Sequence, residues 1–440
     1  MMEGFDVVIL GAGESGIGAA LLAKKNGLKV VVSEYGKIKT AFVNELLTNN
    51  IPFEEGGHNI EILENTNCVV KSPGIPNTAA IIVALKAKGI KVISEIEFAA
   101  GYTKHFIIGI TGSNGKTTTT NLTHHLLVSS GLDAVKCGNV GKSFARQIAE
   151  REANIFVVEL SSFQLDDIDQ FKPNVAIMLN ISPDHLDRYE YKLENYVAAK
   201  FRICKNQDKE DLFIYNDKDE EISKYMESHS INAHLHPIGN TYYQEGKLIA
   251  DQQLFFDTNK LSIQGKHNMQ NSICAIAAAF SVGAVHEGIQ KGLDTFINDP
   301  HRMEKVLELD NVEFINDSKA TNVDSVFYAL DAIEKPIIWV VGGKDKGNDY
   351  EPLMDLVRMK VKAIICLGED NSKLLETFSS QVKIMEDTND VDTAIELAAT
   401  YAEAGDVVLL SPACASFDLF DNYKHRGDEF RRAVLALKEK

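Results

Sequence analysis

The residues with the clearest chemical meaning lie between positions 106 and 118. A β-prone apolar run at 106–110 leads into a glycine-rich turn, Gly112-Ser-Asn-Gly-Lys-Thr117, which opens a polar segment of helical character. Such a turn can hold the phosphates of a nucleoside triphosphate, because backbone N–H groups and the N-terminus of the helix converge on phosphate oxygens. Lys116 would add a positive charge and Thr117 an oxygen ligand for Mg²⁺. We therefore predict an ATP site formed by Gly112, Ser113, Asn114, Gly115, Lys116, Thr117 and Thr118.

Acidic and polar residues follow the next apolar runs of the same segment. Glu159 ends one run, and another leads into a polar cluster at 180–188 that contains Asp184 and His185. Enzymes that use ATP need an acid at such a position to bind Mg²⁺ directly or through water. Ligands of open α/β sheets bind beyond the carboxyl ends of the strands, so we expect these residues to line a site. Lys200, farther along, is by itself an ordinary helical lysine.

A second glycine-rich turn, Gly11-Ala-Gly-Glu-Ser-Gly16, follows the first apolar run and also opens a helix, and Glu34 ends the next run. In this pattern a diphosphate lies on the helix N-terminus and the acid binds a ribose. Two ligands fit it: NAD(P), which would indicate an oxidoreductase, or another diphosphate such as that of a UDP-sugar. The ATP loop favours the second, because a dehydrogenase has no use for an ATP domain. The segment 71–76, which contains Gly74, would form another wall of this site or simply a turn.

Strands that alternate with helices must position these motifs. The first 94 residues contain four β-rich runs separated by helical stretches, which predicts a parallel sheet covered on both faces. A second system of this kind begins at Phe106 and a third near Val312, and the stretch 205–262 is predicted to be an excursion within the middle one. The boundaries fall near Ser94 and near 299–302. We therefore expect an α/β protein with domains at 1–94, 95–299 and 300–440.

Composition limits the classes of protein to which the chain can belong. Its 440 residues exceed what one hydrophobic core usually organises, and 45% of them are hydrophobic, as in soluble globular proteins. The net charge of −18 argues against a nucleic-acid-binding surface. The six cysteines include no Cys-x-x-Cys pair, and the sequence shows no signal peptide and no apolar run of about 18 residues. We expect a cytoplasmic monomer without a membrane or nucleic-acid partner.

Taken together, the motifs resemble those of the Mur ligases, the ATP-dependent amide ligases that build the stem peptide of peptidoglycan. The resemblance extends over the whole chain, and its motifs occur in Mur-ligase order at 112–117, 159–165, 184–187, 266–268, 300–302 and 316–319. The segments 159–165 and 410–418 are most similar to the members that add D-glutamate. The resemblance implies three domains: an N-terminal Rossmann-like domain that binds UDP, a central P-loop ATPase-type domain, and a C-terminal Rossmann-like domain that binds the incoming amino acid.

The resemblance also implies roles for individual residues. The UDP precursor would contact Gly13, Glu14, Ser15, Gly16, Gly74 and Asn139. Besides the phosphate loop, ATP would contact Asn271, Arg302 and Asp317. D-Glutamate would contact Thr321, Lys346, Ser416 and Phe417. Two Mg²⁺ ions would be held by Thr117, Glu159, His185 and Lys200, with Lys200 as its carbamate, because a free ammonium group would repel the metal. The catalytic residues would be Lys116, His185, Lys200 and Lys319.

These roles imply that the chain adds D-glutamate to UDP-N-acetylmuramoyl-L-alanine. ATP would convert the substrate carboxylate into an acyl phosphate, which the amine of D-glutamate then attacks. One departure puts the uracil contact in question: the family commonly has Asp-Thr-Arg where this chain has Glu34-Tyr-Gly36.

Three other classes compete with this interpretation. The first is an NAD-linked oxidoreductase with a regulatory ATP site. The second is a ligase of the folylpolyglutamate synthase type, whose chain would begin with the ATP domain. The third is a non-enzymatic nucleotide-dependent switch, against which Asp184, His185 and Lys200 argue.

Overall fold

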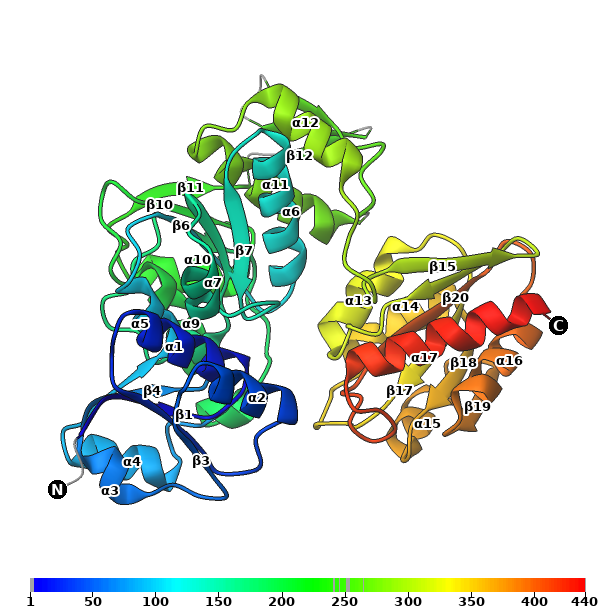
Figure 1. Ribbon diagram of the computed structural model, residues 1–440. Coiled ribbons are helices and arrows are strands. Elements are labelled where there is room, and N and C mark those ends of the chain that lie inside the picture. Colours follow the sequence, from blue (N-terminus) through cyan, green and yellow to red (C-terminus); the bar gives the residue numbers. More distant parts are fainter. Residues whose placement is uncertain (1–3, 240–241, 245, 251–253, 264, 440) are drawn as a thin grey trace. The chain divides into compact units, whose positions relative to one another are not determined.

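The computed structural model describes residues 4–239, 242–244, 246–250, 254–263 and 265–439. Contacts divide the chain into two compact units, Met1–Lys260 with Gln270–Thr295 and Leu261–Met269 with Phe296–Lys440. The first unit contains two parallel sheets and a small antiparallel one, and the second unit contains one mixed sheet (Figure 1). These helix-covered sheets confirm the predicted α/β class. None of the described helices is both long and apolar enough to cross a membrane.

The first sheet has the strand order β3-β2-β1-β4-β5, and its strands are parallel. Helices α1, α2 and α5 pack on one face, and α3 and α4 pack on the other, so strands β1, β2 and β4 are apolar on both faces. The strands are β1 (Phe5–Leu10), β2 (Val30–Glu34), β3 (Phe53–Glu55), β4 (Thr66–Lys71) and β5 (Lys91–Ser94). The helices are α1 (Glu14–Lys25), α2 (Thr40–Thr48), α3 (Ile60–Glu64), α4 (Ala80–Ala87) and α5 (Glu95–Ala100).

The second sheet is also parallel and has the order β11-β10-β9-β6-β8-β7. Its strands are β6 (Phe106–Thr111), β7 (Ala134–Gly138), β8 (Ile155–Glu159), β9 (Val175–Met178), β10 (Leu212–Tyr215) and β11 (His234–Pro237). The helices of this region are α6 (Lys116–Ser129), α7 (Phe144–Glu150), α8 (Ser162–Leu165), α9 (Leu193–Phe201), α10 (Glu220–Ser228), α11 (Lys266–Ser281) and α12 (His286–Thr295). Two 3₁₀ turns flank α9, namely η1 (Leu186–Tyr189) and η2 (Arg202–Cys204).

The predicted excursion at 205–262 needs a correction. Strands β10 and β11 extend the second sheet, and only β12 (Tyr242–Gln244), β13 (Lys247–Ala250) and β14 (Leu254–Asp257) form a separate antiparallel sheet. The edge strand β11 has the sequence His-Leu-His-Pro, without the apolar run by which a buried strand is identified. Part of the excursion, 240–241, 245 and 251–253, lies outside the described residues.

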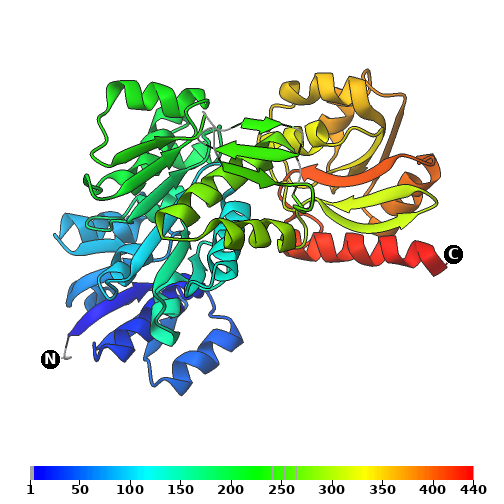
Figure 2. The same cartoon turned by 90° about the horizontal axis from the view of Figure 1, so that it is seen from above.

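The sheet of the second unit has the order β15-β16-β20-β17-β18-β19, with β15 antiparallel to β16 and the other pairs parallel. Helices α16 and α17 pack on one face and α13, α14 and α15 on the other; Figure 2 shows α17, in red, running along one side of the sheet. The strands are β15 (Glu304–Leu309), β16 (Val312–Asn316), β17 (Ile337–Gly342), β18 (Val361–Leu367), β19 (Ile384–Thr388) and β20 (Val407–Ala413). The helices are α13 (Val323–Ala332), α14 (Met354–Lys360), α15 (Ser372–Phe378), α16 (Val391–Tyr401) and α17 (Tyr423–Ala436), with 3₁₀ turns η3 (Glu351–Leu353) and η4 (Leu437–Glu439).

Candidate active site

The glycine-rich turn predicted to bind ATP connects β6 to α6 in the first unit. Gly115 is the N-cap of α6 and has a φ of +82°, which a residue with a side chain rarely adopts. A Cβ atom at this position would also lie 2.5 Å from Asn271 Oδ1. Asn271, a predicted nucleotide contact on α11, therefore lies directly against the loop. Glycine is required here both for the turn and for this close approach.

Residues after β9 hold the phosphate loop in place. The Ser113 N–H donates to Asn180 O at 2.9 Å, and the Asn114 N–H donates to the side-chain oxygen of Asn180 at 2.8 Å. The Ser113 hydroxyl accepts from the Ser182 N–H at 2.9 Å and lies 3.1 Å from the hydroxyl of Tyr196. The predicted polar cluster after this strand thus supports the loop. Tyr196 was not predicted, because only the packing of α9 brings it there.

Two lysines meet at one backbone oxygen of the loop. Lys116 Nζ donates to Gly112 O at 2.7 Å and to Ser113 O at 2.8 Å, and Lys200 Nζ donates to Gly112 O at 2.8 Å. Lys200 is only 1% exposed, so it is not the ordinary helical lysine that its sequence suggested. Burial holds the pKa of Lys200 well below its usual value, and the charge of Lys116 lowers it further. Both effects shift the equilibrium of Lys200 toward the neutral amine.

Glu159 lies at the carboxyl end of β8, beside the phosphate loop. Its partner across the parallel ladder is Ile110 of β6, one residue before the end of that strand. The side chain is 1% exposed, and its Oε1 accepts a hydrogen bond from the side-chain amide of Asn139 at 2.9 Å. Within the described part of the chain, Glu159 Oε2 has no hydrogen-bond partner. A buried carboxylate oxygen left without a donor is a suitable ligand for Mg²⁺.

His185 lies in a strained loop near this site. His185, Glu190 and Tyr191 all have positive φ angles, between 53° and 57°, although none of them is glycine. The imidazole packs edge-on against Phe163, with ring centroids 5.1 Å apart, and its Nε2 lies 3.6 Å from Asp184 Oδ2. Across the described residues, no group of three or more His, Cys, Asp or Glu side chains is arranged to hold a metal. A metal site here would therefore need other ligands, such as a hydroxyl, a phosphate or a modified lysine.

A pocket of about 710 Å³ lies on the first glycine-rich loop. Four of the predicted precursor contacts line it: Gly13, Glu14, Ser15 and Gly74. Gly16 lies against the loop itself, where a Cβ atom would collide with Gly11 O. Asn139 is not in this lining and lies beside Glu159 instead.

Two of the three residues at the departure from the family pattern, Glu34 and Tyr35, also line this pocket. The Glu34 carboxylate accepts from the Ala12 N–H at 2.7 Å and from the Gly36 N–H at 2.9 Å, so it stabilises the loop. Tyr35 is 77% exposed, and its ring centroid lies 5.9 Å from that of His58.

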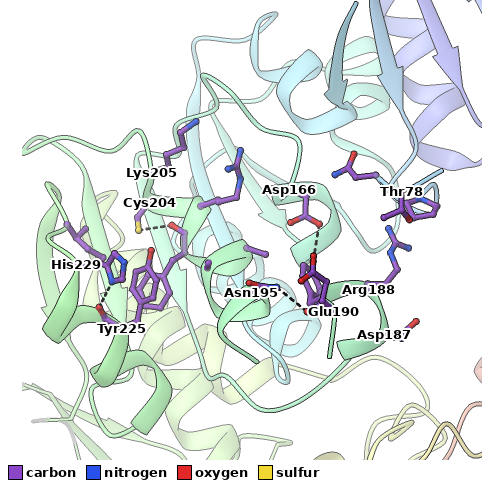
Figure 3. A pocket seen from close by; sticks show the side chains of 18 of the residues that line it. Thr78, Asp166, Asp187, Arg188, Glu190, Asn195, Cys204, Lys205, Tyr225 and His229 are labelled. Atoms are coloured by element: carbon purple, nitrogen blue, oxygen red, sulfur yellow. Dashed lines mark hydrogen bonds between the residues drawn. The ribbon is translucent and has the colours of Figure 1, made fainter. Parts of the chain in front are cut away.

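A further pocket, of about 750 Å³, lies beside α9. Figure 3 shows Asp166, Arg188 and Glu190 at one end of it and Tyr225 and His229 at the other. The described residues that line it do not include those of the phosphate loop or Glu159 and Lys200. This pocket is therefore lined by other residues than those predicted to bind the ATP phosphates and Mg²⁺.

In the second unit, predicted nucleotide contacts gather at one edge of the sheet. Arg302 precedes β15 and Asp317 follows β16, and Glu304 pairs with Asn316 across these two strands, so both residues lie at the same end. Burial raises the pKa of Asp317 to about 7, although the Met303 N–H and the Ser411 hydroxyl donate to its carboxylate. Lys319 follows, with its Nζ 3.9 Å from the ring centroid of Tyr423.

The four predicted D-glutamate contacts follow strands that are neighbours in the same sheet. Thr321 comes after β16, Lys346 after β17, and Ser416 and Phe417 after β20, and these strands are adjacent in the order β16-β20-β17. The Lys344 N–H donates to Ala415 O at 2.8 Å, which joins the loops that carry Lys346 and Ser416. Ser416 is buried, whereas the other three are exposed. The topology thus brings all four to one edge.

Comparison with known proteins gives matches over nearly the whole chain. Family models match in order: the Mur ligase MurD-like N-terminal domain at residues 5–94, the Mur ligase middle domain at 110–279, and the Mur ligase glutamate ligase domain at 301–414. The UDP-N-acetylmuramoylalanine--D-glutamate ligase of Christiangramia forsetii is 48% identical over 444 residues, which cover 99% of this chain and 100% of that protein. The enzyme of the same name from Porphyromonas gingivalis (strain ATCC BAA-308 / W83) is 47% identical over 445 residues, which cover 98% and 99%.

A solved structure shows the same fold. The crystal structure of UDP-N-acetylmuramate-alanine ligase MurC from Thermotoga maritima is similar with a TM-score of 0.62 at 18% sequence identity. The match covers 98% of this chain and 99% of that one. The three-domain architecture is therefore common to both.

Proposed function

Because this chain belongs to the Mur ligase family, we propose that it is an ATP-dependent ligase that joins D-glutamate to UDP-N-acetylmuramoyl-L-alanine. The observation that carries this proposal is the sequence identity of 47–48%, over nearly the full length of the chain, to relatives that are named for this reaction. The phosphate loop and the pocket on the first glycine-rich loop are consistent with it, as is Glu159 Oε2, which has no hydrogen-bond partner among the described residues. The reaction would belong to the cytoplasmic synthesis of peptidoglycan precursors, and a single copy of the chain carries every residue that the proposal uses.

The first chemical step activates the L-alanyl carboxylate of the precursor, which is by itself a poor acylating agent. The L-alanyl carboxylate attacks the γ-phosphorus of ATP, the bond from that phosphorus to the β,γ-bridging oxygen breaks, and ADP leaves. The N–H groups of the phosphate loop and the charge of Lys116 stabilise the transferring group. Lys116 would exchange its bonds to Gly112 O and Ser113 O for phosphate oxygens when ATP binds.

The second step forms the amide bond. The neutral amine of D-glutamate attacks the acyl carbon, the attached nitrogen loses one proton to solvent, and the tetrahedral intermediate expels inorganic phosphate to leave the amide N–H. We propose that Thr321, Lys346, Ser416 and Phe417 hold D-glutamate, that Asn271, Arg302 and Asp317 contact the nucleotide, and that Lys319 acts close to the reacting groups. Most of the protein's contribution to rate would come from aligning two anions and an amine.

Mg²⁺ fits the donors that the first unit provides. Thr117 and Glu159 would hold one ion, and His185 with Lys200 as its carbamate would hold a second. Bound Mg²⁺ neutralises the phosphate charge during transfer. The burial of Lys200 supports the carbamate, since only a neutral amine adds to CO₂, forming an N–C bond and releasing a proton.

Phosphate release from ATP tests this proposal. The chain should release phosphate in the presence of UDP-N-acetylmuramoyl-L-alanine and D-glutamate together, and release should fall to background when either is omitted. Phosphate release with a folate and L-glutamate, or fluorescence transfer to bound NADH, would favour the competing ligase or oxidoreductase interpretation instead.

A further inference from the structure

The acidic residue of the first glycine-rich loop is bonded to a helix of the second sheet. Glu14 is the first residue of α1, and its Oε1 accepts from the Ser143 N–H at 3.0 Å and from Arg146 Nε at 2.7 Å. Ser143 is the N-cap of α7, and Arg146 lies in the first turn of that helix. The Glu14 carboxylate thus fastens the glycine-rich loop to α7.

Arg146 also binds a second acid of the first sheet region. Its two terminal nitrogens contact the two carboxylate oxygens of Glu45 on α2, and one of these contacts measures 3.0 Å between Nη2 and Oε2. Arg146 is only 7% exposed, whereas Glu14 and Glu45 are about one-third exposed at their side chains. One buried guanidinium therefore joins α1, α2 and α7 in a fixed geometry.

The loop before α7 leads from this pair to the candidate metal ligand. In this loop, 138–143, the Gly138 N–H donates to Lys142 O at 2.9 Å, which closes the turn. The Asn139 N–H donates to Glu159 O, and its side-chain amide donates to Glu159 Oε1, both at 2.9 Å. Glu14 and Glu159 are therefore attached to opposite ends of the same short loop.

Charge makes this arrangement relevant to ligand binding. Among the described residues that line the pocket on the first glycine-rich loop there is no lysine or arginine, but there are two carboxylates, Glu14 and Glu34. Glu34 is held by two backbone N–H groups, and Glu14 is held by one N–H and by Arg146. Arg146 is shared by three carboxylates, because its Nη1 also lies 3.6 Å from Glu150 Oε1. Without Arg146 none of this charge would be offset, and Glu14, which lines the pocket, would oppose the binding of an anionic ligand there.

We propose that Arg146 is a positioning residue for the nucleotide-linked precursor: its charge offsets part of the negative charge of Glu14 beside the diphosphate site, and it holds the glycine-rich loop against loop 138–143. This inference rests on the proposed function for the identity of the ligand. It assigns Glu14 a role that differs from direct contact with the precursor, because its carboxylate is bonded to α7.

Calorimetric titration with UDP-N-acetylmuramoyl-L-alanine, without ATP, tests the inference. Arg146→Met should bind the precursor about tenfold more weakly than the wild-type protein, which corresponds to about 1.4 kcal/mol. Arg146→Gln, which keeps a donor but not the charge, should show a similar loss and serves if the methionine variant does not fold. Adding Glu14→Gln to Arg146→Met should restore part of the affinity, because the carboxylate that lines the pocket is then neutral, whereas Glu45 and Glu150 lie outside the lining.

Lys25→Met is the matched control. Lys25 Nζ, at the other end of α1, donates to Ala149 O at 2.8 Å at the end of α7, so it joins the same two helices away from the loop. The affinity of the Lys25→Met variant for the precursor should stay within about twofold of that of the wild-type protein.

Three results would overturn the inference. The first is wild-type affinity in both arginine variants, and the second is a double variant that binds no better than Arg146→Met alone. The third is an equal loss in Lys25→Met, since this would indicate a general loosening of the α1–α7 contact. A wild-type protein that does not bind the precursor would instead contradict the proposed function, and the inference would fall with it.

Discussion

Glu159→Gln should make the protein more stable and less able to bind Mg²⁺. In the fold Glu159 is 1% exposed, and among the described groups its Oε2 has no donor. Leaving a buried polar group unsatisfied costs about 1–3 kcal/mol, and more when the group is charged. The neutral amide avoids much of this cost and can still accept from Asn139. We therefore expect the ligand-free variant to unfold at a higher temperature than the wild-type protein.

Mg²⁺ and ATP, by contrast, should stabilise Glu159→Gln less than they stabilise the wild-type protein. A ligand present at a hundred times its Kd stabilises the folded state by about 2.7 kcal/mol. If loss of the carboxylate weakens binding about a hundredfold, the same concentration would stabilise the variant by only about 0.4 kcal/mol. Thermal unfolding with and without Mg²⁺ and ATP measures this difference directly.

Glu95→Gln supplies the matched control. Glu95 is also 1% exposed, its Oε1 also accepts one N–H donor, from Ala145, and its Oε2 also has no partner among the described residues. It lies at the start of α5 and bonds to α7 rather than to the phosphate loop. This variant should gain stability and keep the full response to Mg²⁺ and ATP. A Glu159→Gln protein with an undiminished response would refute the assignment of Glu159 as a metal ligand.

Three further predictions concern pH and the two lysines. Burial raises the pKa of Glu95 from 4.5 to about 8, so protonated Glu95 contributes its full stability below pH 4.5 and this contribution is lost as the pH rises to about 8. The gain in Tm of Glu95→Gln over the wild-type protein should therefore grow between pH 5 and pH 8. A gain that stays constant over this range would contradict the raised pKa. Lys116→Ala should keep its fold but lose at least nine-tenths of its turnover, a change of about 1.4 kcal/mol in barrier or more, and a smaller loss in the phosphate-release assay would contradict the role of Lys116. Lys200→Ala should be nearly inactive and should recover part of its activity with added acetate or propionate, whereas full activity, or no response to any carboxylate, would exclude the carbamate.

The sequence was sufficient for features that depend on local pattern. The phosphate loop requires glycine at 115 and a lysine at the next position, and both requirements are visible in the chain itself. Glu159 was found because it ends an apolar run that became β8. The strands of the three sheets that the runs predicted are present because buried parallel strands are apolar on both faces.

The remaining features depend on contacts between distant residues. Lys200 and Gly112 are 88 positions apart, so only the packing of α9 shows that Lys200 is buried and shares its acceptor with Lys116. Glu14 and Arg146 are 132 positions apart, and nothing near either residue in the sequence indicates their pairing. The sequence pattern does not predict strand β11, because an edge strand does not need an apolar run.

The most direct test of the central claim is the choice of amino acid. The protein would be incubated with ATP, Mg²⁺ and UDP-N-acetylmuramoyl-L-alanine together with D-glutamate, L-glutamate, L-lysine or meso-diaminopimelate, and the product would be identified by mass spectrometry. A pocket that fixes two carboxylates and one amine accepts a single handedness, so only D-glutamate should give the amide product. Equal product from both enantiomers of glutamate, or a preference for L-lysine or meso-diaminopimelate, would contradict the account.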